Sequence, residues 1–236
     1  MKNLEKLDIV YFVKDTSLND ELLYSLRTVE KNFPHNRVWF IGGCPYNLKP
    51  DKYIKVEQDK DTKWANTNVL MRVACENSEI TDDFVLFNDD FFVMSPVNEL
   101  PYYYDDTLGK RVDKLSGKYI HSRYRTNLAI CTEQLSFKGY NTLNYAVHIP
   151  MVINKEKMLK CMSKFPDGLM WRSLYGNFIN PKRYERMQIT DPKIWKTETH
   201  PTGNEIFLSS EDKAFRYGAV GNHIKERFTK PSRFEV

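Results

Sequence analysis

The residues best suited to chemistry are two adjacent carboxylates, Asp89 and Asp90, which interrupt a strongly apolar stretch between Phe87 and Phe91. Burying an unpaired carboxylate costs several kcal/mol, so the chain must place the pair at a sheet edge or neutralise it. Ligands of parallel α/β sheets bind outside the carboxyl ends of the strands. A divalent cation there takes oxygen ligands from Asp and from a diphosphate. The pattern predicts Asp90 and Asp89 as ligands of Mn²⁺ or Mg²⁺, with a plain acidic turn as the alternative.

The elements that must position this pair alternate between strand and helix. Short apolar runs predict strands over 7–13, 37–41, 53–56 and 84–87. Apolar residues at helical spacing predict one helix that is capped by Ser17 and stops at Pro34, and a second over 66–76. We therefore expect an α/β fold, with a mostly parallel (mixed) sheet flanked by helices in a single domain.

The remaining chain has fewer clear elements. Helices are expected over 154–165, with Asn154 as the N-cap, and over 211–217. The segments 95–147 and 166–205 show no regular pattern, and the basic tail after Gly221 lacks helical periodicity. We expect loops in these regions.

Composition excludes several classes of protein. Hydrophobic residues make up 41% and charged residues 28% of the 236, which is globular usage and excludes a disordered chain. The net charge of +4 permits a polyanionic partner without requiring one. The sequence has no GxGxxG, P-loop or GxSxG motif, which argues against common dehydrogenases, kinases and hydrolases. Four isolated cysteines, no signal peptide and no membrane span predict a soluble, cytoplasmic protein with reduced thiols.

Two blocks of the chain resemble a known family. The segments 8–11 and 20–34 are similar to the opening conserved blocks of Stealth-type proteins, and 84–92 is similar to their second block. The resemblance implies transfer of a sugar 1-phosphate from a nucleotide sugar, on a catalytic region similar to GT-A glycosyltransferases. The chain departs from the family pattern at 12–15 and at 63–68, and its last block lacks the usual Cys.

The chain also resembles a minimal GT-A glycosyltransferase. In such enzymes a DxD-like motif holds Mn²⁺, a later acidic motif opens a helix, and a His nearer the C-terminus completes the metal site. The resemblance assigns these parts to Asn88–Asp90, to 210–212 and to His223.

Three further positions are candidates for catalysis or metal binding. Glu211 or Asp212 would be the general base that takes the acceptor proton, although Ser and acids at this point also make an ordinary helix start. His223 would ligate the metal through neutral imidazole, with a surface histidine as the alternative. His148, in an apolar stretch, is either a hydrogen-bonded core residue or part of the site.

Polar residues after the strands are candidates for binding. Besides Asp89, the candidate donor-binding residues are Asp15, Thr16, Lys63, Asn66 and Asn88. Aromatic, basic and amide groups around Gly176 would line an acceptor or sugar pocket, since rings stack on sugar faces and amides bind hydroxyls; these are Trp171, Arg172, Tyr175 and Asn177. A packed loop without a binding role is the alternative for this segment.

These observations predict a metal-dependent glycosyltransferase that moves a sugar from a nucleotide-sugar donor to a hydroxyl acceptor. Residues 1–94 would form the donor-binding half and residues 95–236 the acceptor and catalytic half. A glycan, a cell-surface polymer and a modified DNA base stay open as acceptors. Stealth-like sugar-1-phosphate transfer is the first alternative, and a non-catalytic carbohydrate- or nucleic-acid-binding module is the second. The sequence decides neither the oligomeric state nor retention or inversion at the anomeric carbon.

Overall fold

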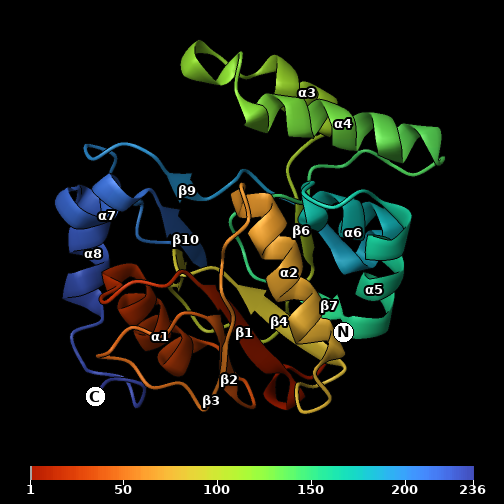
Figure 1. Cartoon of the computed structure of the whole chain (residues 1–236). Coiled ribbons are helices and arrows are strands. Elements are labelled where there is room, and N and C mark those ends of the chain that lie inside the picture. Colours follow the sequence, from red (N-terminus) through yellow and green to blue (C-terminus); the bar gives the residue numbers. More distant parts are fainter. Residues whose placement is uncertain (1) are drawn as a thin grey trace.

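A five-stranded mixed sheet forms the centre of the protein, as a computed structural model shows (Figure 1). The structure describes residues 2–236, apart from the side chain of residue 118. In spatial order the strands are β3 (Lys52–Lys55), β2 (Val38–Gly42), β1 (Asp8–Val13), β4 (Asp83–Phe87) and β7 (Met151–Asn154). The first four run parallel, and β7 is antiparallel to β4. The predicted α/β fold with a mostly parallel, mixed sheet is confirmed.

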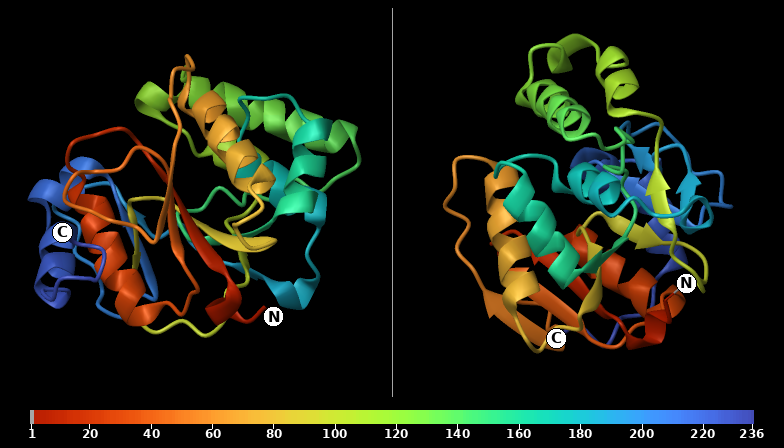
Figure 2. Two further views of the ribbon diagram at one scale, coloured as in Figure 1. Left: turned by 60° about the horizontal axis from the view of Figure 1, so that its bottom comes forward. Right: turned by 90° about the vertical axis from the view of Figure 1, so that its right-hand side faces the viewer.

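Helices cover both faces of this sheet, because its inner strands are apolar on both sides. The helix α1 (Asp20–Asn32) packs on one face through Leu22, Leu26 and Val29. The other face carries the helices α2 (Lys63–Glu76), α5 (Lys155–Lys164) and α6 (Trp171–Ile179). Figure 2 shows α1 and α2 on opposite sides of the strands.

A second sheet begins where the chain leaves β4. It consists of β5 (Phe91–Val93), β10 (Phe207–Ser210) and β9 (Lys193–Ile194). The helices α7 (Asp212–Tyr217) and α8 (Ala219–Arg227) pack against it through a separate apolar cluster around Phe92 and Phe215. Asn88–Asp90 therefore lie at the junction between the two sheets.

Two further groups of elements complete the fold. A two-stranded parallel sheet pairs β6 (Tyr102–Tyr104) with β8 (Arg186–Gln188). The helices α3 (Leu108–Asp113) and α4 (Arg123–Phe137) project from the rest of the molecule in Figure 1 and in the right-hand view of Figure 2. We call residues 108–138 the helical arm. The short 3₁₀ helices are η1 (Leu4–Lys6), η2 (Gly117–Tyr119) and η3 (Arg183–Glu185).

The predicted starts of the first two helices were wrong by a few residues. Asn19, rather than Ser17, caps α1: its side chain accepts a hydrogen bond from the backbone N–H of Leu22. Thr62 caps α2, so this helix begins at Lys63 instead of at residue 66. Both caps are residue types that satisfy the free N–H groups of a first turn. By contrast, the predicted Asn154 cap of α5 is confirmed.

The expectation of loops in 95–147, in 166–205 and after Gly221 was wrong, since these segments contain α3, α4, α6 and α8. In α8, Gly221 hid the helix from the sequence analysis, because glycine is normally unfavourable inside a helix. A Cβ at Gly221 would lie 1.6 Å from the carbonyl oxygen of Phe215. The glycine is therefore required by the close approach of α8 to α7. No helix among the described residues is long and apolar enough to cross a membrane.

Candidate active site

A cavity of about 800 Å³ opens at the carboxyl ends of the parallel strands. It is lined by Lys14 and Asp15 after β1, Gly42 at the end of β2, the segment 55–62 that starts at the last residue of β3, and Asp89 after β4. The first turn of α2 adds Lys63 and Asn66 to the wall. A helix N-terminus presents free N–H groups and a positive partial charge, which favours an anion. The end of the cavity at α2 therefore suits an anionic group such as phosphate.

Two glycines hold the loop after β1 against the end of β2. A Cβ at Gly43 would lie 2.5 Å from the Cα of Asp15 and 2.7 Å from the carbonyl oxygen of Lys14. Gly42 has a φ of 114°, and a Cβ there would lie 2.3 Å from the carbonyl oxygen of Val13. Only glycine permits this backbone approach, so the Gly42–Gly43 pair sets the position of Asp15 at the cavity.

Three carboxyl groups interact electrostatically beside the cavity. Burial and the charge of Asp90 raise the pKa of Asp89 above its usual value, although Asn19 donates a 2.8 Å hydrogen bond to Asp89 Oδ2. Glu21 in the first turn of α1 has its pKa raised to about 8 by burial and by the charges of Asp90 and Asp89. The Oγ of Ser210 lies 3.0 Å from Glu21 Oε1 and donates to it. Repulsion among these acids favours a proton or a cation between them.

In the structure a lysine supplies positive charge to this acidic group. The Nζ of Lys193 donates to Asp90 Oδ2 over 2.7 Å, and the Oγ of Ser209 donates to the same oxygen over 3.0 Å. Only 13% of the Lys193 side chain and 12% of the Asp90 side chain are exposed, so the ion pair is largely withdrawn from water. Burial and the nearby charge of Lys193 lower the pKa of Lys63.

A histidine and an aspartate form a second polar pair. The Nδ1 of His148 lies 3.0 and 2.9 Å from the two carboxylate oxygens of Asp191, and the His148 backbone N–H donates to Oδ1 over 3.1 Å. Burial alone would raise the pKa of Asp191, but the hydrogen bonds and charge of His148 outweigh it and hold that pKa below its usual value. The Asp191 carboxylate accepts from Nδ1 and so orients the imidazole ring, with Nε2 outside this pair.

Aromatic rings and a buried arginine connect the two pairs. The ring of Trp195 lies edge-on to His148, with 6.0 Å between centroids, and the Nζ of Lys193 lies 5.0 Å from the centroid of the same indole. Arg172 lies over the Phe91 ring and donates to the carbonyl oxygen of Ile149. Burial lowers the pKa of Arg172 to about 10, against the opposing charges of Asp90 and Asp191. The guanidinium therefore interacts with both carboxylates.

The predicted donor-binding residues lie at this edge of the sheet. Asp15, Lys63, Asn66 and Asp89 line the large cavity. Asn66 also holds the loop before α2, since its side chain exchanges hydrogen bonds with the backbone of residue 60. Two others do not line this cavity: the Oγ1 of Thr16 is buried without a hydrogen-bond partner, and the backbone carbonyl of Asn88 accepts from the N–H of Phe91.

The two acids predicted as a general base begin a helix. The side chain of Glu211 accepts a 2.8 Å hydrogen bond from the backbone N–H of Lys213 and caps α7. The carboxylate of Asp212 is 54% exposed and pairs with Arg216 one turn along. The simpler expectation of a helix start is confirmed, but Glu211 is the cap, and the serine expected in that role, Ser210, ends β10. Both side chains are thus engaged within their own helix.

The predicted acceptor segment is the helix α6 rather than a loop, and it sends its side chains in different directions. Arg172 reaches the site through Asp90 and Asp191. Trp171 belongs to the apolar core, and Asn177 binds the backbone of Leu143. The helix buries most of one face against α5 and the loop before β7, which is why these polar groups serve packing.

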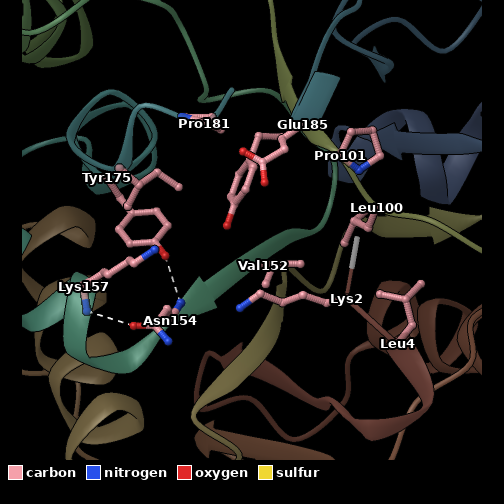
Figure 3. Close-up of a pocket in the computed structure, with 12 residues that line it drawn as sticks. Lys2, Leu4, Leu100, Pro101, Val152, Asn154, Lys157, Tyr175, Pro181 and Glu185 are labelled. Carbon is pink, nitrogen blue, oxygen red and sulfur yellow. Dashed lines mark hydrogen bonds between the residues drawn. The ribbon is translucent and has the colours of Figure 1, made fainter. Parts of the chain in front are cut away.

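Tyr175 faces a different pocket, of about 150 Å³, at the opposite edge of the sheet (Figure 3). Its hydroxyl accepts a 2.9 Å hydrogen bond from the backbone N–H of Asn154, which pairs with Asp83 at the start of β4. Pockets for organic ligands usually measure about 300–1,000 Å³. This pocket is therefore too small for a nucleotide sugar, and Tyr175 lies away from the acids after β4.

The predicted metal ligands are not all brought together. Within residues 2–236, no group of three or more His, Cys, Asp or Glu side chains is arranged to hold a metal ion. His223 lies in α8, and its Nε2 is buried without a hydrogen-bond partner. Asp89 and Asp90 remain as two adjacent carboxylates, a set that Mg²⁺ uses when substrate phosphates supply the other oxygens. The donor set thus fits an ion bound together with a diphosphate, and the ion stays a prediction.

Several site residues escaped the sequence analysis. Asp191, Lys193 and Trp195 lie in a segment without periodicity, where β9 has only two residues. Asn19 and Glu21 belong to the first turn of α1, where polar residues are ordinary. Asp191, Lys193 and Trp195 are alternate residues, and alternate residues of an extended chain share a face. This spacing was the one local signal that the three side chains lie together.

Comparisons with known proteins found only distant similarity. No family model matches the chain, and no curated protein matches it. A crystal structure of the galactosyltransferase LgtC with donor and acceptor sugar analogs is similar over 96% of this chain and 98% of that chain, with 11% identity and a TM-score of 0.48. An active-site mutant of LgtC has the same coverage and identity, with a TM-score of 0.49. The glycosyltransferase GlyE of Streptococcus pneumoniae TIGR4 has 9% identity and a TM-score of 0.36, covering 79% of this chain and 46% of that one. The Stealth resemblance is not confirmed.

Proposed function

We propose that the protein is a glycosyltransferase that moves a sugar from a nucleotide-sugar donor to a hydroxyl acceptor. The observation that carries this proposal is the position of Asp89. Its carboxylate lines the large cavity at the ends of the parallel strands and adjoins Asp90, which interacts with Lys193 and Arg172. A charged diphosphate and a neutral sugar would thus meet acids, cations and an aromatic ring in one place.

The donor would enter the cavity with its diphosphate toward the first turn of α2. The N–H groups of that turn and the ammonium of Lys63 favour negative charge. Lys193 and Arg172 extend this positive field on the side of Asp90. Asp15 and the segment 55–62 would surround the nucleoside end of the donor.

In the proposed transfer the acceptor hydroxyl gives its proton to Nε2 of His148, while its oxygen forms a bond to the anomeric carbon. The bond between that carbon and the diphosphate oxygen breaks, and its electron pair leaves with the diphosphate. Asp191 orients the imidazole and stabilises its protonated form. The exposed indole of Trp195, 49% accessible, offers a flat apolar face to a sugar ring.

We propose Mn²⁺ or Mg²⁺ as the cofactor, held by Asp89 and Asp90 together with donor oxygens. When bound, the ion would offset the charge that develops on the leaving diphosphate. Lys193 occupies Asp90 Oδ2 in the structure, so the ammonium would have to move toward the diphosphate.

The test is a product assay with a panel of nucleotide sugars and hydroxyl acceptors. Glycosyl transfer releases a nucleoside diphosphate, whereas the alternative transfer of a sugar 1-phosphate releases a nucleoside monophosphate. We expect the diphosphate from the wild type and an at least hundredfold slower release from the Asp89→Asn variant, since removing one electrostatic contact in a site typically costs about 10²–10³ in rate.

Asp82→Asn is the matched control. Asp82 is exposed and precedes β4, at the opposite end of the strand from Asp89. This variant should retain the wild-type rate. Release of a monophosphate would replace the proposal by sugar-1-phosphate transfer. A wild type that turns over no nucleotide sugar, or an Asp89→Asn variant with undiminished turnover, would refute it.

A further inference from the structure

The positive charge of the protein is concentrated in the helical arm. Residues 108–138 contain seven Lys and Arg and two Asp and Glu, whereas the other 205 residues contain 28 and 29. The arm thus carries an excess of five positive charges, and the rest of the chain is close to neutral. Such segregation marks a surface for a polyanion.

The cations of the arm are available to a partner. Arg123 and Arg125 in the first turn of α4 are exposed, and within the described residues neither guanidinium pairs with a carboxylate. Lys110 and Lys114 share the single carboxylate of Asp106, with 66% and 58% of their side chains exposed. Positive charge at the N-terminus of a helix opposes the helix dipole and is locally unfavourable, so Arg123 and Arg125 do not serve the stability of α4.

The arm is fixed to the candidate active site. Leu128, Cys131 and Leu135 of α4 are buried in the main apolar core, and Asn127 donates to the carbonyl oxygen of Gly168 before α6. Arg111 of α3 lies close enough to Asp191, the partner of His148, for each to shift the pKa of the other. A molecule bound along the arm would therefore lie beside the proposed base.

The distribution of charged and apolar residues in the helical arm favours a stiff polyanion over other anionic partners. A helix that binds a bilayer lays a continuous apolar face into it, whereas the apolar residues of α4 face the protein core. A flexible polymer loses more conformational entropy on a rigid cationic surface than a stiff one does. Over its 15 residues α4 extends about 22 Å, a length over which duplex DNA presents many phosphates.

We propose that the helical arm binds duplex DNA and so presents a hydroxyl of a DNA base to the active site; the second half of this inference rests on the proposed glycosyl transfer. The contacts are between cationic side chains of the arm and backbone phosphates. They position the duplex without reading its sequence.

The test measures binding of a fluorescent 20-base-pair duplex, by anisotropy, at 50 and 200 mM salt. We expect the wild type to bind at 50 mM and to weaken steeply with salt. The double variant Arg123→Ala/Arg125→Ala should bind roughly tenfold more weakly at 50 mM, with a salt slope reduced by about two. Alanine favours helix, so α4 is retained, and Arg123→Lys/Arg125→Lys should bind nearly as the wild type does.

Lys6→Ala/Lys49→Ala is the control, since both lysines are exposed and lie outside the arm. It should leave binding unchanged. An equal loss in this control, no binding by the wild type at 50 mM, or tighter binding to phosphatidylglycerol vesicles or poly(glycerol phosphate) would overturn the proposal. If the protein binds DNA but turns over no nucleotide sugar, the arm is a DNA-binding surface and only the proposed transfer is refuted. If it turns over a nucleotide sugar but does not bind DNA, the DNA-binding proposal is refuted and the transfer is not.

Discussion

Replacing Lys193 by Met removes the cation beside Asp90 while keeping much of the side-chain volume. The carboxylate of Asp90 then retains the Ser209 hydroxyl and the more distant charge of Arg172. Breaking a buried ion pair by removing one partner costs about 3–5 kcal/mol. Since Arg172 still offsets part of the charge, we expect the free energy of unfolding to fall by about 3 kcal/mol. In a chain of this size that corresponds to a melting temperature lower by about 6–12 °C.

A double-mutant cycle separates this electrostatic cost from lost packing. In the Lys193→Met background, Asp90→Asn removes the unpaired charge and should restore about half of the lost stability. Differential scanning calorimetry at pH 7 measures all four proteins. If Lys193→Met lowers stability by less than about 1 kcal/mol, or if Asp90→Asn destabilises both backgrounds equally, the pair is not the buried interaction that its 2.7 Å contact indicates.

The same variant tests the proposed metal ion without any activity assay. Once Lys193 no longer occupies Asp90 Oδ2, an added cation meets two adjacent carboxylates and no ammonium hydrogen-bonded to that oxygen. A free Mn²⁺ concentration of 100 times the dissociation constant would stabilise the folded state by about 2.7 kcal/mol. We expect Mn²⁺ to raise the melting temperature of Lys193→Met more than that of the wild type. An equal response in both would argue against the carboxylates as ligands.

Three further predictions concern the base, the acid cluster and the cavity. His148→Gln should slow transfer about 10²–10⁴-fold in a product assay while leaving donor affinity unchanged; equal loss of both would exclude a role as base. The pKa of the Glu21 carboxyl rises from 4.5 in the unfolded chain to about 8 in the folded protein. Between these pH values the folded state keeps a proton that the unfolded state has released. The free energy of unfolding should therefore fall as pH rises through this range. Urea unfolding at pH 5 and 9 should show a smaller fall for Glu21→Gln than for the wild type; an equal fall in both would contradict the raised pKa. Gly43→Ala should displace Asp15 and weaken donor binding, measured by calorimetry, whereas Gly109→Ala, with no atom within 4 Å of the added Cβ, should not; equal effects would contradict the proposed role of the glycine.

The sequence was sufficient to predict the four parallel strands of the central sheet. Three of them, β1, β2 and β4, are continuous apolar runs bounded by polar residues. It also placed Asp89 at the carboxyl end of β4 and Asp15 after β1. Both predictions rest on a general property of parallel sheets, since their strand ends meet at one edge. The strand β7 was not predicted, because its pairing is antiparallel and depends on contacts with β4, which lies far away in the chain.

The remaining site depends on tertiary structure. Lys193 and Trp195 are placed by a two-residue strand that pairs with β10, and no periodicity can reveal so short an element. Asp191 gains its role only from His148, 43 residues earlier in the chain. In α8, Gly221 indicated a turn but serves close helix packing. Local patterns thus predicted the strand ends, whereas the base and the cation are brought together by contacts between distant segments.

The most direct test of the central claim is donor binding to the cavity beside Asp89. Thermal unfolding of the wild type would be followed with a panel of nucleotide sugars, each with and without Mn²⁺. The proposal predicts that at least one donor at 100 times its dissociation constant raises stability by about 2.7 kcal/mol, and that Asp89→Asn removes this gain while Asp82→Asn keeps it. No stabilisation by any donor, or an equal gain in Asp89→Asn, would contradict the claim.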